Sequence, residues 1–281
     1  MVSTIRELGI TKIDVLIGTH PHEDHIGGLD AVIDNFSIGT IYMPKIAHTT
    51  KTYEDVLTAI KNKGYKITSP LAPLAFDLGD ADCTVLAPVA LEGESTSNLN
   101  NLSIVIKMVF GDTSFLFQGD AEEIVESQIL DSGVNIQADL IKLGHHGSNT
   151  SSSDEYLQAA GPDIAIISVG KGNSYGHPHE ETLAILENLG IKIHRTDESG
   201  TIIVTSDGKN ITIDKNESAV QVDAPPVVNE PEVVGTLVYV TDTGTKYHVT
   251  SCSYLKDNKR AVPLSDAIDQ YEPCKICKPP Y

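Results

Sequence analysis

Four metal-capable side chains, His20, His22, Asp24 and His25, fall within six residues of one another. They directly follow the apolar run 13–17, which predicts a strand that delivers all four into one small volume. Because residues i and i+2 of an extended segment point the same way, His20 and His22 can bind one metal ion as a pair. The other two can face a second ion, and imidazole with carboxylate suits zinc, iron or manganese. Two such ions about 3.5–4 Å apart activate water for hydrolysis. The alternative is a polar loop that is merely rich in histidine.

Three later strand ends also carry histidine or aspartate. They supply Asp120 after strand 114–118, His145 and His146 after strand 139–143, and His177 after strand 163–169. Because sheets gather functional residues at one edge, we expect these side chains to join the first cluster. A carboxylate at that edge can bridge two metal ions, although Asp120 would also serve as an N-cap for the helix predicted from residue 121.

Composition limits the classes of partner that the chain can have. The 281 residues carry a net charge of −19, and 40% of them are hydrophobic, so a packed core is expected. An acidic surface disfavours non-specific attraction to nucleic acid or anionic lipid. Aromatic residues make up 5% and tryptophan is absent, so composition does not favour a stacking platform for bases. The sequence contains neither an apolar run of membrane-spanning length nor a visible signal peptide.

Residues 1–214 alternate short β-branched runs with helical stretches, which is the pattern of a layered α/β domain. The sequence predicts strands at 13–17, 38–43, 83–87, 103–110, 114–118, 139–143, 163–169, 191–195, 201–205 and 211–213. It predicts helices at 28–36, 52–63, 121–131, 153–160 and 179–189. Residues 215–234 are rich in proline, acidic residues and valine and predict an extended linker. Residues 235–281 would then form a small C-terminal module.

The C-terminal module contains side chains at the spacing of a closed metal site. His248 and Cys252 are four residues apart, and Cys274 and Cys277 form a CxxC pair. Three thiolates and one imidazole suit one tetrahedral structural zinc ion, which would fold a module too small for a large core. The alternative is a loose terminus with reduced or disulfide-bonded cysteines. Cys83 lies far away in the sequence.

The motifs together resemble a known family. The stretch Thr19-His-Pro-His-Glu-Asp-His-Ile-Gly-Gly28 is similar to the HxHxDH motif of the metallo-β-lactamase superfamily, and in particular to its ComEC-like competence group. Later motifs of that group resemble Asn98-Leu-Asn-Asn-Leu-Ser-Ile104, Phe117-Gln-Gly-Asp120, Leu143-Gly-His-His-Gly-Ser148 and Val169-Gly-Lys-Gly-Asn-Ser-Tyr-Gly-His-Pro-His179. The resemblance covers residues 1 to about 213. It implies an αββα sandwich, here expected to lack its leading N-terminal strands, and metal-dependent hydrolysis.

The resemblance also implies two divalent metal ions, zinc or manganese. His20 and His22 would hold one ion, while Asp24, His25 and His177 would hold the other. Other members of the superfamily place a third histidine near the start of the central strand, where this chain has asparagines at positions 98, 100 and 101. Asparagine is a poor zinc ligand and manganese tolerates oxygen ligands better, so the first ion is expected to be held weakly as zinc.

The same resemblance assigns roles to the remaining candidates. Asp120 would bridge the two ions, and Asp24 would orient the attacking water as well as bind metal. His145 or His146 would act as a further ligand, a proton donor or a phosphate contact.

Three functions remain open at this point. The resemblance implies a phosphodiesterase or nuclease that degrades DNA during uptake, at the outside or surface of a bacterial cell. The same centre could hydrolyse a lactone, ester or lactam. The third possibility is a catalytically inert protein that binds DNA or docks. The C-terminal module resembles the Ada-type zinc-binding domain, but His248 stands where that family has its methyl-accepting cysteine, which argues against methyl transfer.

Overall fold

A computed structural model describes residues 1–89 and 98–216, together with residues 237–241, 245–248, 252, 259–263, 267, 271–275 and 277 of the C-terminal part. The chain divides into two compact units, Met1–Ala219 and Val220–Tyr281. Each unit is described by itself below. Among the described helices, none has the length and apolar character that crossing a bilayer requires.

The first layers of the larger unit are a small parallel sheet and the helices that cover it. The sheet is three-stranded, in the order β1-β2-β3, and β1 pairs only with β2 among the described strands. Its strands are β1 (Lys12–Ile17), β2 (Ser37–Tyr42) and β3 (Ile67–Thr68), and its helices are α1 (Val2–Glu7), α2 (Glu23–Ile26), α3 (Leu29–Asn35) and α4 (Lys51–Lys63). Helix α4 begins where the Thr50 side chain accepts from Tyr53 N–H and ends at Gly64, whose φ of 73° suits glycine.

The second sheet is seven-stranded, in the order β10-β9-β8-β7-β6-β5-β4. Strands β7 to β10 are parallel, whereas β4 to β7 are joined as antiparallel neighbours. Its strands are β4 (Leu74–Leu78), β5 (Ala81–Ala87), β6 (Val105–Phe110), β7 (Thr113–Phe117), β8 (Leu140–Lys142), β9 (Ile164–Ile167) and β10 (Lys192–Arg195). The helices that accompany it are α5 (Glu123–Asp131), α6 (Asp154–Ala160), α7 (Glu180–Asn188) and α8 (Thr196–Ser199), with 3-10 turns η1 (Leu99–Leu102) and η2 (Gly144–Gly147).

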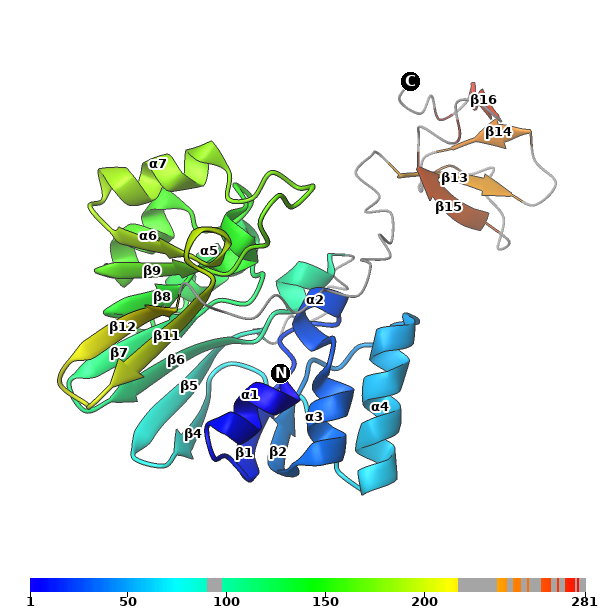
Figure 1. Cartoon of the computed structure of the whole chain (residues 1–281). Helices are drawn as coiled ribbons and strands as arrows, with labels where there is room; N and C mark the ends of the chain where they lie inside the picture. The colour runs from blue at the N-terminus through cyan, green and yellow to red at the C-terminus, as the bar shows by residue number, and fades with distance from the viewer. Residues whose placement is uncertain are drawn as a thin grey trace. The chain divides into compact units, whose positions relative to one another are not determined.

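Separate cores between these elements show four layers. One core packs α3 and α4 on the first sheet, and a second, which includes Tyr42, Val85 and Ile106, lies between the two sheets. A third packs α5, α6 and α7 on the outer face of the seven-stranded sheet. Figure 1 shows these helices on opposite outer sides of the two sheets. The fold is therefore the expected αββα sandwich of the α/β class.

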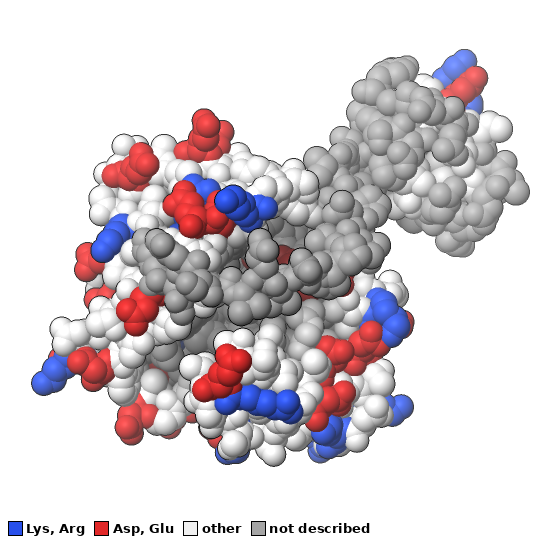
Figure 2. All heavy atoms as spheres, viewed as in Figure 1, with Lys and Arg blue, Asp and Glu red and all other residues white. Residues whose placement is uncertain are grey.

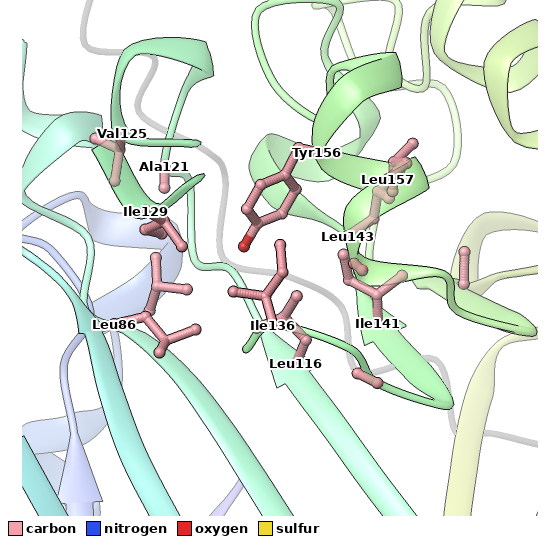
Figure 3. Packing of buried hydrophobic residues seen from close by; sticks show 14 of the residues in the cluster. Leu86, Leu116, Ala121, Val125, Ile129, Ile136, Ile141, Leu143, Tyr156 and Leu157 are labelled. Atoms are coloured by element: carbon pink, nitrogen blue, oxygen red, sulfur yellow. The ribbon is translucent and has the colours of Figure 1, made fainter. Parts of the chain in front are cut away.

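The third core holds the helices that surround the strand ends of interest. Ile141 on β8 is fully buried there, which contributes about 1.5–3 kcal/mol for a side chain of this size. Figure 3 shows the Tyr156 ring of α6 pointing toward Ile136, with Ile129 of α5 on one side and Leu143 on the other. Helices α5 and α6 are thus locked against β7 and β8.

A hairpin completes the larger unit. Strands β11 (Thr201–Ser206) and β12 (Ile211–Asn216) pair as an antiparallel two-stranded sheet. Their apolar side chains pack on Phe115, Leu140 and Ile166 of the seven-stranded sheet. Strand β12 runs two residues past the predicted boundary at residue 214, and the rest of the predicted linker, residues 217–234, lies outside the described residues.

The smaller unit is built from short strands. They are β13 (Leu237–Thr241), β14 (Lys246–Tyr247), β15 (Lys259–Pro263) and β16 (Glu272–Pro273). Strand β13 pairs with β15 and β14 pairs with β16. Their core consists of Val238, Val240, Tyr247, Val262 and Ala267, with Tyr271 packed against it.

Candidate metal centre

The topology brings four strand ends to one place. Strands β7, β8 and β9 are parallel neighbours, so their carboxyl ends share one edge of the sheet. Asp120 follows β7, the His145-His146 pair follows β8, and His177 follows β9. The fourth strand end, that of β1, comes from the other sheet and carries the first histidine cluster. The contact between Ile104 N–H and Thr19 C=O, at 3.0 Å, joins this cluster to the segment that leads into β6.

Asp24, His25, Asp120 and His146 form a compact group whose ligand atoms all lie within 4.8 Å of one another. Oδ2 of Asp120 lies 3.1 Å from His25 Nε2 and 3.4 Å from His146 Nε2. Oδ2 of Asp24 lies 3.3 Å from His25 Nε2 and 3.0 Å from His146 Nε2. Ligand atoms around one ion with bonds of about 2.0–2.2 Å lie about 3–3.5 Å apart, so this spacing suits a metal ion.

His20 and His22 form a second pair beside the same oxygen of the Asp120 carboxylate. His20 Nε2 lies 3.0 Å from His22 Nδ1 and 3.7 Å from Oδ2 of Asp120. His20 is fully buried, and its Nδ1 lies 3.3 Å from the Ser103 hydroxyl. Two imidazoles that face one carboxylate in this way can hold an ion as a pair.

Burial and charge divide the histidines into two protonation classes. Burial lowers the pKa of His20 to about 3, and burial also lowers the pKa of His22. For His146 burial acts in the same direction, but hydrogen bonds to Asp120 and Asp24 overcome it and raise the pKa to about 10. The pKa of His25 is raised for the same reasons.

The carboxylates show the reciprocal effect. Burial opposes ionisation of Asp120, but hydrogen bonds from His146 and His25 lower its pKa well below the ordinary value. Burial likewise opposes ionisation of Asp24, and contacts with the same two imidazoles lower its pKa. Both carboxylates are therefore ionised, which is the state that binds a cation.

One atom of the group lacks a partner that a cation would supply. Asp120 is 3% exposed, and its Oδ1 is buried without a hydrogen-bond partner. A buried carboxylate oxygen without a partner costs free energy, and such atoms in native structures require an explanation. A cation held beside this carboxylate would supply that partner. The donor set of the compact group thus fits a divalent metal ion.

His146 reaches this group through a strained turn. His145 has φ 45° and ψ 44°, and His146 has φ 54° and ψ 20°, which are left-handed conformations that cost roughly 1–2 kcal/mol per residue. His145 N–H donates to Gly119 C=O at 3.1 Å, and His146 Nδ1 lies 2.7 Å from Ser168 C=O. The turn is therefore held from the ends of both β7 and β9, which leaves His146 Nε2 facing the carboxylates.

A buried polar network supports the start of this turn. Gly144 N–H donates to Gln118 Oε1 at 3.1 Å, and Gln118 Nε2 donates to the Glu126 carboxylate. Glu126 is fully buried and also accepts from the backbone N–H groups of Ser152 and Ser153. Burial raises the pKa of Glu126. A side chain at position 144 would collide with Gln118 and Ser151, so glycine is required there.

His145 points into a different set of partners. Its Nδ1 lies 2.9 Å from the Thr150 hydroxyl and 3.6 Å from Glu122 Oε1. Its Nε2 lies 3.4 Å from Asn100 Nδ2. Asn98 and Asn100 donate to the Glu122 carboxylate at 2.7 and 3.1 Å. The asparagines thus contact Glu122 and His145, and it is Ser103 and Thr19 that contact His20.

The structure places the predicted site residues in three positions. His146, together with Asp24, His25 and Asp120, lies in the compact group, and His20 and His22 adjoin it. His177 lies outside the group, with its ring centroid 6.3 Å from that of His146 and 5.4 Å from that of His145. Its assignment as a metal ligand stays a prediction. Burial, with the neighbouring imidazole of His145, lowers the pKa of His177 to about 4.

Three polar residues of the site were not singled out from the sequence. Glu122 and Glu126 lie on a predicted helix, and Gln118 ends a predicted strand. The signal for Glu126 is its position, because residues 122, 125, 126 and 129 share one face of a helix and two of the four are apolar. An acidic residue on the buried face of a helix indicates a polar network in the core.

The smaller unit contains the second group. The ligand atoms of His248, Cys252, Cys274 and Cys277 all lie within 4.8 Å of one another, and the three cysteines are thiols that are not joined in disulfides. His248 Nδ1 lies 3.1 Å from Cys252 Sγ and 3.9 Å from Cys277 Sγ. Backbone hydrogen bonds from His248 to Tyr239 and from Cys274 to Tyr247 position these segments. Three thiols and one imidazole fit a structural zinc ion.

This chain is similar to known proteins, and its family match lies within the larger unit. Residues 3–171 match the family model described as the metallo-beta-lactamase superfamily. The chain is 36% identical over 194 residues to ComE operon protein 3 of Bacillus subtilis, which is 69% of this chain and 25% of that protein. It is 30% identical over 203 residues to competence protein ComA of Neisseria gonorrhoeae, which is 72% of this chain and 26% of that protein. The chain thus spans about a quarter of the length of these relatives.

Recombination protein 2 of Haemophilus influenzae is 29% identical over 192 residues, which is 68% of this chain and 22% of that protein. Among solved structures, the diiron β-hydroxylase CmlA from Streptomyces venezuelae overlaps 66% of this chain and 44% of its own, at 15% identity and a TM-score of 0.47. Because this overlap is weak, the assignment of the fold is based on the strands and helices described above.

The protonation of the compact group predicts proton release when metal binds. The raised pKa of His146, about 10, means that its imidazolium stabilises the metal-free fold at neutral pH, and that this contribution is lost as pH rises through 10. A metal ion requires the neutral imidazole, so binding at pH 7 should release about one proton or more per chain, and affinity should fall as pH falls.

Isothermal titration of Mn²⁺ into chelator-treated protein, in two buffers of different ionisation enthalpy, measures this release. The buffer-dependent heat should persist in His48→Ala, which changes a histidine outside the group, and should shrink in His146→Ala. Equal heats in both buffers for the unmodified protein would contradict the protonation described here.

Proposed function

The chain belongs to the metallo-β-lactamase superfamily and is a metal-dependent hydrolase related to competence proteins; we propose that it is a phosphodiesterase that cleaves DNA. The observation that carries the proposal is the 36% identity to ComE operon protein 3 over 69% of the chain. Residues 3–171, which match the superfamily model, contain the compact group and the His145 turn. As part of the same proposal, we place the reaction at the outer surface of a bacterial cell, where DNA that is taken up first arrives.

The electrostatics argue for local rather than general attraction of DNA. The net charge is −19, and on the face drawn in Figure 2 the basic side chains are scattered among acidic ones. A phosphodiester would therefore be drawn to the chain by the cations held at Asp120 and not by a broad basic surface. Little of the binding free energy should come from release of counterions. The affinity for DNA should therefore fall less steeply with salt concentration than is usual for a nuclease.

Each side chain of the centre has a role in this proposal. Asp24, His25, Asp120 and His146 would hold one divalent ion, and His20, His22 and Asp120 the other. When bound, such ions lower the pKa of water toward neutrality and so supply the nucleophile. Asp24 is the most exposed carboxylate of the group, so it can orient that water as well as bind. His146 is held by Ser168 and Asp120 and would therefore act as a ligand and not as a mobile proton carrier.

In this proposal His145 acts on the leaving group. It lies outside the metal group, and its Nδ1 faces Thr150 and Glu122. Glu122 is itself fixed by two asparagine amides, so it orients the imidazole as a carboxylate behind a histidine does in many sites. From there His145 can donate a proton to the departing oxygen or stabilise its charge.

The ligand sets also bear on which metals would bind. The His20 group offers two imidazoles and a shared carboxylate, whereas the amide nitrogens of Asn98 and Asn100 donate to Glu122. We therefore propose manganese or zinc in the group with Asp24 and a more weakly held ion at His20 and His22.

The proposed activity predicts phosphodiester hydrolysis that depends on the carboxylates. With Mn²⁺ or Zn²⁺ the protein should cleave single-stranded DNA and bis-nitrophenyl phosphate. The Asp120→Ala and Asp24→Ala variants should each hydrolyse substrate at least about 100-fold more slowly. Mutation of a residue that only hydrogen-bonds to a metal ligand already lowers metal affinity or activity by about 10–100-fold. Asp82→Ala, which removes an exposed carboxylate from β5, is the matched control and should keep full activity.

The same assay includes a simple lactone. Lactone turnover without phosphodiester cleavage would replace the proposal with a lactone, ester or lactam hydrolase. Metal-loaded protein that hydrolyses none of these substrates but binds DNA would indicate an inert binding protein. Cleavage that survives Asp120→Ala would show a contaminating nuclease.

For the smaller unit we propose one structural zinc ion held by His248, Cys252, Cys274 and Cys277. The full chain reconstituted with Co²⁺ should show thiolate-to-cobalt charge-transfer absorption, which the histidine and carboxylate centre cannot produce. Cys274→Ser should abolish or strongly reduce that absorption. Cys83→Ser, which changes a cysteine buried in the sheet core, should leave it intact. Equal absorption in both variants would refute the site.

A further inference from the structure

An exposed aromatic ring lies at the end of a column of rings that begins in the metal centre. The ring of His177 is nearly parallel to that of His146, with 18° between their planes and 6.3 Å between their centroids. Tyr175 stacks on the same His177 ring, at 25° and 5.7 Å. Tyr175 is 49% exposed, so part of its ring remains open to solvent. Neither the metal group nor the His145 set uses this surface.

The segment that holds Tyr175 is organised by one side chain. Asn173 Oδ1 accepts from Tyr175 N–H at 3.1 Å and from His177 N–H at 3.0 Å. Its Nδ2 donates to Gly170 C=O at 3.2 Å and to His177 C=O at 2.6 Å. Four hydrogen bonds to a single side-chain amide fix the backbone that carries the two rings. A ligand that stacks on Tyr175 would therefore meet a preorganised surface and lose little affinity to ordering.

The chemistry of the surface suits a flat aromatic group attached to an anion. An aromatic face stacks on any base, because every base has a π-face, and such stacking does not depend on base sequence. Lys171, exposed in the same loop, adds a cation of the kind that contacts backbone phosphates. The low aromatic content of the chain predicts no broad stacking platform. The surface described here is instead the single ring of Tyr175.

We propose that Tyr175 stacks on an unpaired nucleobase next to the phosphodiester that occupies the metal centre. This inference rests on the proposed nuclease function and names its substrate more closely, as a nucleic acid strand with an accessible base. A base inside a duplex has both faces covered by its neighbours, so single-stranded DNA or a frayed end is preferred. The base supplies affinity that the acidic surface does not.

The chain contains no tryptophan, so Tyr175→Trp creates a single fluorescent reporter at this position. The probe is a short thymidine phosphorothioate, which resists hydrolysis, compared with an abasic phosphorothioate of the same length, both in the presence of Zn²⁺. The thymidine strand should quench the indole emission of the Tyr175→Trp variant, while the abasic strand should not. Val134→Trp, at an exposed position beyond the end of α5, is the matched control and should respond to neither strand.

Affinities of the native chain and two further variants complete the test. Tyr175→Ala should weaken binding of the thymidine strand by about 5- to 150-fold, the loss of one stacked base, and leave binding of the abasic strand unchanged. Tyr175→Phe should bind both strands as the native chain does. Equal quenching by both strands, or an equal loss of both affinities in Tyr175→Ala, would overturn the stacking. If the native protein still cleaves DNA, those results would contradict the stacking and leave the proposed nuclease function standing. Absence of cleavage by the native protein would instead contradict the proposed nuclease function and not the stacking.

Discussion

The Asp120 carboxylate is the group on which the geometry of the larger unit's site depends. It is almost fully buried, and imidazoles of His20, His25 and His146 approach one of its oxygens. Two of those imidazoles come from the end of β1 and the third comes from the end of β8, so one carboxylate joins elements of two different sheets. A buried charge of this kind is tolerated only when opposite charge and hydrogen bonds surround it. The strained turn at His145 and His146, and the Gln118–Glu126 network beneath it, keep the third imidazole in that position.

The acidic surface shapes how such a centre could act on DNA. A protein of net charge −19 repels a polyanion at long range, and this repulsion is screened beyond about 8–10 Å at physiological salt. Attraction must then arise at short range, where divalent ions bound beside Asp120 present concentrated positive charge to one phosphate. This arrangement favours ends and flexible single strands, which can approach the centre with few phosphates near the surface. The proposed stacking on Tyr175 adds an interaction that does not depend on charge.

Much of the fold followed from local patterns in the sequence. The i, i+2 spacing of His20 and His22 after an apolar strand predicts a metal-binding pair, and their ring nitrogens lie 3.0 Å apart. The predicted strands correspond to β1, β2 and β5 to β12, because each is a short run rich in β-branched or other apolar residues. Strands β3 and β4 were missed, since β3 has two residues and β4 follows a proline and carries Asp77. The linker prediction from residue 217 on lies outside the described residues.

The details of the site depended on tertiary contacts that no local pattern contains. Which of His145, His146 and His177 joins the carboxylates is decided by a turn with two consecutive positive φ angles, a conformation that histidine signals only weakly. The asparagines of η1 contact Glu122 because η1 packs beside the start of α5, a pairing of residues more than twenty apart. The spacing of the C-terminal ligands was visible in the sequence, whereas their approach to within 4.8 Å depends on the pairing of β14 with β16.

Anomalous diffraction from crystals of this chain soaked in Mn²⁺ tests the bridging role of Asp120 most directly. We expect two anomalous peaks beside the Asp120 carboxylate, one bounded by Asp24, His25 and His146 and a weaker one bounded by His20 and His22. Crystals of Asp120→Asn soaked in the same way should lose or weaken both peaks. Metal bound away from Asp120, or no metal in the larger unit at saturating Mn²⁺, would contradict the account.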